Sequence, residues 1–443
     1  MSRYDKYKDS GIAWIGSIPT HWEVKPFKTI YRLGKGLSIT KADLTKNGVA
    51  VINYGQIHSK LNIGTAIQDH LIKYVPDKYL KTDAKSLVFE GDVIFADTSE
   101  DLDGCGNCIY VDRSMNLFAG YHTIIARNTS GFINKYLPYL FKTDLWRGQL
   151  RTTVSGVKVL SISQKILATT TVTLPPLNEQ QQIADFLDRK CAEIDELVAL
   201  QEVMIGELKA YKQSVITEVV TRGLNPDAPL RDSGVKWIGE IPKHWECGRL
   251  KNIISERLKY GANENGITYS ELLPRYVRIT DIIENELKEN IEKQSLAEDV
   301  AKDYILTNGD ILFARSGGTV GKSFIYKSSD GRCAFAGYLI KASINSSNLP
   351  QYVYYYTKTD SYSEWKNRIF IQATIQNIGA DKYSIMEIPL PPLPEQQAIA
   401  DHLDRKCEEI DQLIAIKQEK IEQLKEYKKS VIFEYVTGKK RVQ

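Results

Sequence analysis

Two long segments of the chain carry apolar residues at steps of three, four and seven, the spacing of one face of an α-helix. In residues 178–222 the stripe consists of Ile183, Leu187, Ile194, Val198, Ile205, Leu208, Val215 and Val219. In residues 394–443 it consists of Ile399, Leu403, Ile410, Ile414, Ile421, Leu424, Val431 and Tyr435. A stripe this narrow on a helix this long needs a partner to be buried, so we expect the two helices to pair as a coiled coil.

The two helical segments are near copies of each other. "LPPLNEQQQIADFLDRKCAEIDELV" at residues 174–198 and "LPPLPEQQAIADHLDRKCEEIDQLI" at residues 390–414 differ at only six of 25 positions. Such closeness at a constant offset indicates an internal duplication in which the helix is held nearly unchanged.

The sequence ahead of each helix is also repeated, but less closely. "DSGIAWIGSIPTHWE" at residues 9–23 matches "DSGVKWIGEIPKHWE" at 232–246, and "GDVIFAD" at 91–97 matches "GDILFAR" at 309–315. Short β-branched and aromatic runs broken by Gly, Asn and Asp indicate strands and tight turns, whereas "INKYLPYLFKTDLWRGQL" indicates helix. Each long helix therefore follows a module of mixed helices and strands.

These patterns predict an α+β protein with four parts. Two mixed α/β modules, residues 1–177 and 223–393, are each followed by a long helix, residues 178–222 and 394–443. Because the ends of a module usually lie close together at its surface, the two helices should run antiparallel, with the whole chain pseudo-two-fold. The segment before Tyr31 matches the segment that comes directly after the first helix, so we expect it to dock where the second helix ends.

Charge is distributed unevenly, although the net charge is only +3. Residues 1–177 carry 22 Lys and Arg against 15 Asp and Glu, and residues 178–222 carry 5 against 9, which favours a polyanionic partner for the module rather than for the helix. No apolar run is long enough for a signal peptide or for the roughly 20 residues of a membrane span. Six cysteines are too few for a disulfide framework, so we expect a cytoplasmic protein with free thiols.

Two short motifs resemble parts of nucleotide or metal sites. "SGGTVGKS" at residues 316–323 nearly matches a phosphate-binding loop, but the "SFIYK" at its end is typical of a strand, where that loop requires a helix. "CGNC" at residues 105–108 supplies half of a zinc site, and no second pair with suitable spacing exists. We interpret the first motif as a Gly-rich β-turn and predict no metal site.

No arrangement of side chains predicts catalysis by this chain. "PDKYLKTDAK" at residues 76–85 contains the carboxylates and lysine that a nuclease uses, but its pattern indicates an amphipathic helix. His21 and His244 lie inside the repeated "IPxHW" motif and are interpreted as packing residues beside tryptophan. The alternatives left open are a coiled-coil protein–protein scaffold without DNA binding, and a nuclease or P-loop ATPase.

The paired "PPLxEQxxIAxxLD" stretches, each behind a variable module and a "WIGxIPxHW" motif, resemble the specificity (S) subunit of type I restriction-modification enzymes. The resemblance covers essentially the full length. It implies that residues 1–177 and 223–393 are target recognition domains and that residues 178–222 and 394–443 are spacer helices. It also implies a non-catalytic, sequence-specific DNA-binding subunit that reads a bipartite, asymmetric target, one half-site for each module.

The resemblance further implies the partners of the chain. Two modification subunits would use S-adenosylmethionine to methylate adenine in double-stranded DNA, and two restriction subunits would use ATP and Mg to translocate and cleave it. This chain would bind no cofactor itself and contact no membrane. Apolar positions outside the coiled-coil seam are the expected docking surfaces, one in each repeat.

Candidate DNA contacts are basic and amide residues that alternate with Gly in predicted loops, because these side chains supply the donors and acceptors that distinguish base edges. In the first module they are Lys35, Lys41, Asn53, Gln56, Ser155 and Lys158. In the second module they are Arg275, Arg278, Arg315, Thr319, Lys322, Thr374, Gln376 and Asn377.

Overall fold

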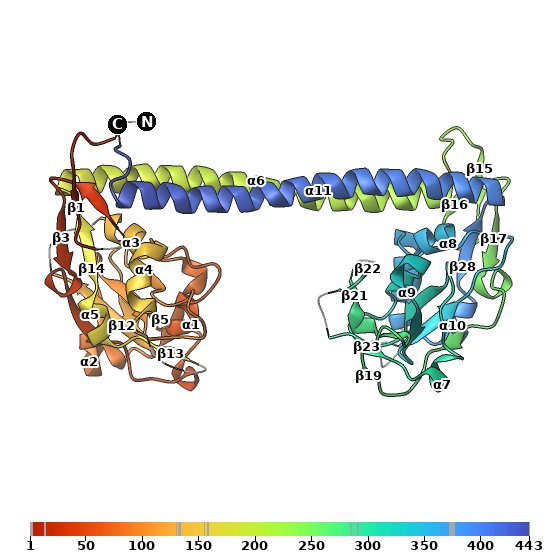
Figure 1. The fold of residues 1–443 in the computed structure, drawn as a ribbon, viewed down its shortest axis with the longest axis horizontal. Coiled ribbons are helices and arrows are strands. Elements are labelled where there is room, and N and C mark those ends of the chain that lie inside the picture. Colours follow the sequence, from red (N-terminus) through yellow and green to blue (C-terminus); the bar gives the residue numbers. More distant parts are fainter. Residues whose placement is uncertain are drawn as a thin grey trace. The chain divides into compact units, whose positions relative to one another are not determined.

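The structure is a computed structural model that describes residues 3–12, 15–129, 131, 134–154, 156, 159–283, 286–289, 292–371 and 377–442. The chain divides into two compact units, and each unit contains one module and a part of both long helices. Unit 1 consists of residues 1–201 and 419–443, and unit 2 consists of residues 202–418. Figure 1 shows both units and labels many of their elements.

The described part of unit 1 contains two four-stranded sheets. One is antiparallel with the strand order β10-β8-β12-β4, and the other is mixed with the order β6-β5-β11-β7, in which β11 runs parallel to β5. Two-stranded sheets pair β1 with β2, β3 with β14 and β9 with β13. The strands are β1 (Tyr7–Asp9), β2 (Ser17–Pro19), β3 (Glu23–Pro26), β4 (Tyr31–Lys35), β5 (Val49–Ile52), β6 (Lys73–Val75), β7 (Leu87–Val88), β8 (Val93–Ala96), β9 (Thr98–Ser99), β10 (Cys108–Tyr110), β11 (Leu117–Ala119), β12 (Thr123–Asn128), β13 (Leu160–Ser161) and β14 (Thr171–Leu174).

Unit 2 has a similar plan that differs at the edges of its second four-stranded sheet and in one of its two-stranded sheets. Its four-stranded sheets have the orders β18-β27-β24-β25 and β19-β23-β20-β26, and β26 runs parallel to β20. Two-stranded sheets pair β15 with β16, β17 with β28 and β21 with β22. The strands are β15 (Leu230–Asp232), β16 (Glu240–Pro242), β17 (Glu246–Arg249), β18 (Lys259–Tyr260), β19 (Ile267–Thr268), β20 (Arg275–Val277), β21 (Ile282–Ile283), β22 (Glu286–Leu287), β23 (Gln294–Ser295), β24 (Ile311–Ala314), β25 (Ser323–Ile325), β26 (Cys333–Phe335), β27 (Leu339–Ala342) and β28 (Glu387–Leu390).

Short helices accompany the sheets, and the two long helices are single uninterrupted elements. The long helices are α6 (Leu177–Arg222) and α11 (Leu393–Val436). The short ones are α1 (Tyr54–Ile57), α2 (Tyr79–Thr82), α3 (Tyr136–Phe141), α4 (Asp144–Arg151), α5 (Gln164–Thr169), α7 (Glu298–Ala301), α8 (Pro350–Tyr356), α9 (Asp360–Ile371) and α10 (Ala380–Ser384). The expected mixture of helices and strands in each module is therefore confirmed.

The central strand of each module is buried on both faces. In β8, Val93 and Phe95 belong to a core shared with α3, α4 and the long helices, whereas Ile94 belongs to the core shared with the second sheet. In β24, Phe313 belongs to the core shared with α8, α9 and the long helices, whereas Leu312 belongs to the core shared with the second sheet. This two-sided burial explains why "GDVIFAD" and "GDILFAR" are continuous apolar runs rather than alternating ones.

The long helices form the expected antiparallel coiled coil. Within unit 1 the Lys428 ammonium lies 2.6 Å from the Asp195 carboxylate, and within unit 2 Lys212 lies 2.6 Å from Asp411. From Asp195 to Lys212 is 17 residues forward along α6, and from Lys428 to Asp411 is 17 residues back along α11. The apolar stripe is buried at its ends, where Ile183, Leu187, Ile399 and Leu403 are all 0% exposed.

One carboxylate at the start of each long helix joins the two repeated motifs. Glu179 is hydrogen-bonded to His21 (2.8 Å) and accepts a hydrogen bond from the Trp22 indole (3.2 Å). Glu395 makes the same contacts with His244 (2.9 Å) and Trp245 (3.1 Å). The interpretation of the two histidines as packing residues is therefore wrong: they are exposed and pair with the glutamate of "PPLxEQ".

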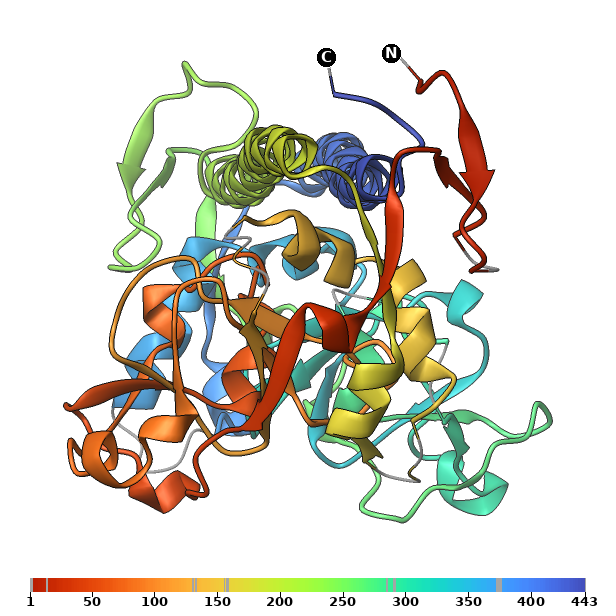
Figure 2. The ribbon, with the colours of Figure 1, turned by 90° about the vertical axis from the view of Figure 1, so that its left-hand side faces the viewer.

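The N-terminal segment docks where α11 ends, as the order of the repeats predicts. The Tyr7 hydroxyl donates to the carbonyl of Gly438 (3.1 Å), and the Lys439 ammonium donates to the carbonyl of Ser17 (2.6 Å). Figure 2 shows the red N-terminal hairpin and the dark blue C-terminal segment of unit 1. A tyrosine of each module also holds the end of a long helix: the Tyr136 hydroxyl donates to the carbonyl of Val436 (3.0 Å) in unit 1, and the Tyr352 hydroxyl donates to that of Val220 (3.1 Å) in unit 2.

Candidate nucleic-acid interface

The residue directly after the central strand occupies an equivalent place in both modules. In unit 1 the Asp97 N–H donates to the carbonyl of His122 (3.1 Å), and the Asp97 carbonyl accepts from Ile162 N–H (2.7 Å). In unit 2 the Arg315 N–H donates to Tyr338 (3.1 Å), and the Arg315 carbonyl accepts from Ile378 N–H (2.9 Å). Three chain segments therefore meet at Asp97 and again at Arg315.

Arg315 is held in place by an aromatic side chain. Its guanidinium lies 4.9 Å from the centre of the Tyr260 ring, and the Tyr260 hydroxyl accepts a hydrogen bond from Ala380 N–H (2.9 Å). The next residue, Ser316, forms a β-bridge with Asn377. Stacking on a fixed ring restricts the rotamers of Arg315, so its planar donor group has a defined direction.

The Gly-rich turn after Arg315 is open and basic. Gly317 and Gly318 are exposed, and a Cβ added at either would meet no atom within 4 Å. Burial, with a smaller effect of the nearby Lys322, lowers the pKa of Lys358 to about 8. Burial and Lys322 also lower the pKa of Lys366. Lys322 is itself exposed, so the turn offers a positive charge that favours a polyanion.

The equivalent place in unit 1 is acidic and aromatic. Asp97 lies 3.3 Å from the Nδ1 of His122, a residue with a positive φ of 54°. The rings of Tyr54 and His122 pack edge to face, with their centres 5.5 Å apart. The loop that continues from Asp97 exposes three further carboxylates, at Glu100, Asp101 and Asp103.

Near both Asp97 and Arg315, a glycine allows two loops of the module to approach each other closely. At Gly120 a Cβ would lie 1.9 Å from the Asn53 Oδ1, and at Gly337 a Cβ would lie 2.0 Å from the Asn263 Oδ1. At Gly120 a side chain would displace the buried Asn53, which explains the glycine there.

Among the candidate DNA contacts of the first module, the structure leaves some side chains exposed and buries another. Lys35 and Lys41 are exposed and Gln56 is partly exposed. Asn53 is 0% exposed and accepts a hydrogen bond from Tyr121 N–H (3.2 Å), so in this structure it shapes the loop. Ser155 and Lys158 lie outside the described residues.

The candidates of the second module divide similarly. Arg315, Thr319, Lys322 and Asn377 come together around the Gly-rich turn. Arg275 is buried and bonded to Glu289 (2.9 Å), and Arg278 is bonded to Asp281 (3.0 Å), so both side chains have internal partners. Thr374 and Gln376 lie outside the described residues.

The residues that sequence reasoning missed are Asp97, His122, Tyr260 and Tyr338. Tyr338 is 66% exposed, and its carbonyl accepts a hydrogen bond from Arg315 N–H. No sequence pattern around a single tyrosine predicts that position. Asp97 did carry a signal, because it occupies the place of Arg315 in the repeated "GDxxFA" motif. A comparison of the two copies for residues of opposite charge would have found it.

The alternative sites find little support among the described residues. No group of three or more His, Cys, Asp or Glu side chains could hold a metal ion there. Cys105 and Cys108 are free, and burial raises the pKa of the Cys108 thiol to about 12. The segment after "SGGTVGK" is the strand β25, as expected of a β-turn rather than a phosphate-binding loop. In the described part of the chain, every helix is too short or too polar to span a bilayer.

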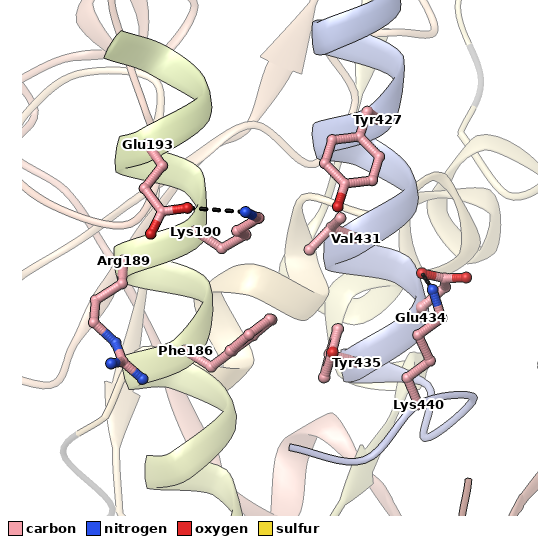
Figure 3. A pocket seen from close by; sticks show the side chains of 9 residues that line it. All are labelled: Phe186, Arg189, Lys190, Glu193, Tyr427, Val431, Glu434, Tyr435 and Lys440. Carbon is pink, nitrogen blue, oxygen red and sulfur yellow. Dashed lines mark hydrogen bonds and ion pairs between the residues drawn. The ribbon is translucent and has the colours of Figure 1, made fainter. Parts of the chain in front are cut away.

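A groove lies on the surface of the coiled coil within unit 1. Figure 3 shows Phe186 of α6 and the α11 residues Tyr427, Val431 and Tyr435 facing one another across it. The Phe186 and Tyr435 rings are 4.4 Å apart at their centres. The charged side chains at its rim are Arg189, Lys190, Glu193, Glu434 and Lys440.

Comparison with known proteins gives one consistent result. The family described as type I restriction modification DNA specificity domain matches residues 19–202 and 242–426. A putative type I restriction enzyme MjaX specificity subunit of Methanocaldococcus jannaschii is 26% identical, over 97% of this chain and 96% of its own length. The EcoKI specificity subunit of Escherichia coli is 22% identical, over 88% of this chain and 83% of its own length.

Solved structures share the fold. A chain from a study of complex assembly and conformational transition of the type I R-M system has a TM-score of 0.71 at 19% identity, covering 95% of this chain and 98% of that one. The HsdS subunit from Thermoanaerobacter tengcongensis has a TM-score of 0.54 at 17% identity, with the same coverage.

Proposed function

The chain belongs to the family of type I restriction modification DNA specificity domains, and from this premise we propose that it reads a bipartite, asymmetric DNA target and scaffolds the modification and restriction subunits. The observation that carries the proposal is the pair of equivalent sites at Asp97 and Arg315. The two modules share one fold but present opposite charge at the same place, as readers of two different half-sites would.

The basic turn of unit 2 supports contact with a phosphate backbone. Lys322 is exposed in the turn that follows Arg315, the Lys366 side chain lies against Gly321, and the Lys358 ammonium donates to the carbonyl of Ser323 (3.1 Å). Phosphate contacts from such a cluster would position the module, while contacts to base edges would supply specificity. The DNA-contact role of the other candidates stays a prediction.

The coiled coil supports docking of two identical partners. Leu197 and Leu200 of unit 1 are about half exposed, and their repeat mates Leu413 and Ile416 of unit 2 are exposed to a similar extent. Exposed aliphatic residues at matching positions offer the same surface twice, which fits two modification subunits. The groove around Phe186 in unit 1 extends this surface.

In this proposal catalysis belongs to the partners. The modification subunits would use S-adenosylmethionine, and the restriction subunits would use ATP and Mg, while this chain supplies recognition in the cytoplasm.

The test is binding of the chain, assembled with its two modification subunits, to duplexes that carry a randomised bipartite site. We expect enrichment of one motif with two unlike half-sites, and an affinity that falls steeply with salt because phosphate contacts release counterions. Recovery of no motif and no salt-dependent binding would instead support the coiled-coil scaffold without DNA contact.

A further inference from the structure

Asp97 and Arg315 share one more property besides their equivalent place. The Oδ1 of Asp97 and the Nε of Arg315 are both buried, and neither has a hydrogen-bond partner among the described residues. A buried polar atom without a hydrogen bond destabilises the folded state and is uncommon in folded proteins. Its occurrence at the same place in both modules points to a shared ligand-binding role.

We propose that this position determines specificity in each module. Arg315 would donate to the O6 and N7 acceptors of a guanine, and Asp97 would accept from the N4 amino group of a cytosine, both in the major groove. The inference rests on the proposed function, since it names the bases that each half-site requires at one position.

A base edge explains Arg315 better than a phosphate does. In the turn the exposed Lys322 already offers a phosphate a point charge. Arg315 instead presents a flat donor group whose direction is fixed by the Tyr260 ring. Bidentate recognition of guanine needs two donors in one plane with a fixed orientation, which this guanidinium provides.

Asp97 excludes a phosphate more directly, because its carboxylate would repel one. Its side chain is 34% exposed although Oδ1 is buried, so part of it reaches the surface. The Nδ1 of His122 lies 3.3 Å from Oδ1 and makes no hydrogen bond with it. An acidic residue on a DNA-reading surface is explained by acceptance from an amino group of a base.

Selection of randomised bipartite duplexes tests the inference, with the chain assembled with its modification subunits. We expect Arg315→Ala to reduce the preference for guanine at one position of one half-site by about tenfold to hundredfold. Asp97→Ala should do the same for a cytosine in the other half-site, and Asp97→Asn should move that preference toward adenine, which asparagine recognises. Lys302→Ala and Asp77→Asn change the same charges at exposed positions elsewhere and should leave every preference intact.

Arg315→Lys is a second variant, chosen because the alanine variant could fail to fold. It keeps the positive charge and removes only the planar guanidinium. It should retain most of the affinity while weakening the guanine preference, because a lysine can reach O6 or N7 but lacks the planar pair of donors. A motif selected by the wild-type complex but unchanged in the Asp97 and Arg315 variants would overturn the inference and leave the proposed function standing. Failure of the wild-type complex to select any motif would overturn both.

Discussion

Glu179 accepts hydrogen bonds from the N-terminal segment at Tyr4 and Trp22 and is paired with His21. Trp22 is 0% exposed, so its indole N–H would be left buried and unpaired without this carboxylate. We therefore expect Glu179→Ala to lower the free energy of unfolding of unit 1 by about 1–3 kcal/mol. Urea unfolding followed by tryptophan fluorescence measures the change.

Glu196→Ala is the matched control for this variant. Glu196 lies on the same helix, is exposed, and should change stability by less than about 0.5 kcal/mol when replaced. Equal effects of the two substitutions would mean that the bonds to Glu179 do not stabilise unit 1.

Lys358 makes stability depend on pH, because burial lowers its pKa from 10.5 to about 8 in the folded protein. Between these two values the unfolded chain binds a proton that the folded protein does not, so folding becomes more favourable as pH rises. The unfolding free energy of the wild type minus that of Lys358→Met should therefore not change with pH below about pH 8. Above that it should rise by at most about 1.4 kcal/mol per pH unit.

Urea titrations at pH 7, 8, 9 and 10 measure this difference. Lys142→Met should behave alike in unit 1, because burial also lowers the pKa of Lys142 to about 8. A difference that stays constant from pH 7 to 10 would show that neither ammonium is destabilised by burial.

At the scale of one residue, the chemical type of a candidate could be predicted, but its partners could not. Arg278 was a candidate because arginine recognises base edges, yet its guanidinium is bonded to Asp281 and to the carbonyl of Glu292. The second of these contacts depends on how the loop folds, which no local pattern encodes. Arg315, at the end of a buried strand and before a Gly-rich turn, had enough local context to be found.

The stability of the coiled coil should come from its apolar stripe rather than from its ion pairs. Leu403 is 0% exposed, so Leu403→Ala should lower the free energy of unfolding of unit 2 by about 2–5 kcal/mol. The Lys212–Asp411 pair lies at the surface, and its coupling in a double-mutant cycle should be below about 1 kcal/mol. Urea unfolding of the four variants and the wild type measures both effects, and a coupling larger than the loss at Leu403 would contradict this account.

At the scale of elements, periodicity predicted the long helices well. α6 begins at Leu177, one residue before the expected start, and α11 ends at Val436, before the end of the expected range. The sheets were harder to predict, because the strands are two to six residues long and β5 pairs in parallel with the distant β11. Such pairing is set by tertiary contacts between segments that look alike in sequence.

At the scale of the whole chain, comparison of the two repeats shows which features both copies keep and which differ between them. Glu179 and Glu395, with their His and Trp partners, are shared because they attach each module to a long helix. Asp97 and Arg315 differ because, in this account, they face different bases. The repeat in sequence was therefore enough to predict the architecture, and the departures from it indicated where recognition lies.

The most direct test of the central claim is sequencing of methylated adenines in the DNA of cells that express the modification subunits with and without this chain. The account predicts methylation at one bipartite motif with two unlike half-sites, present only when this chain is expressed. An identical pattern of methylated adenines in both cells would contradict it.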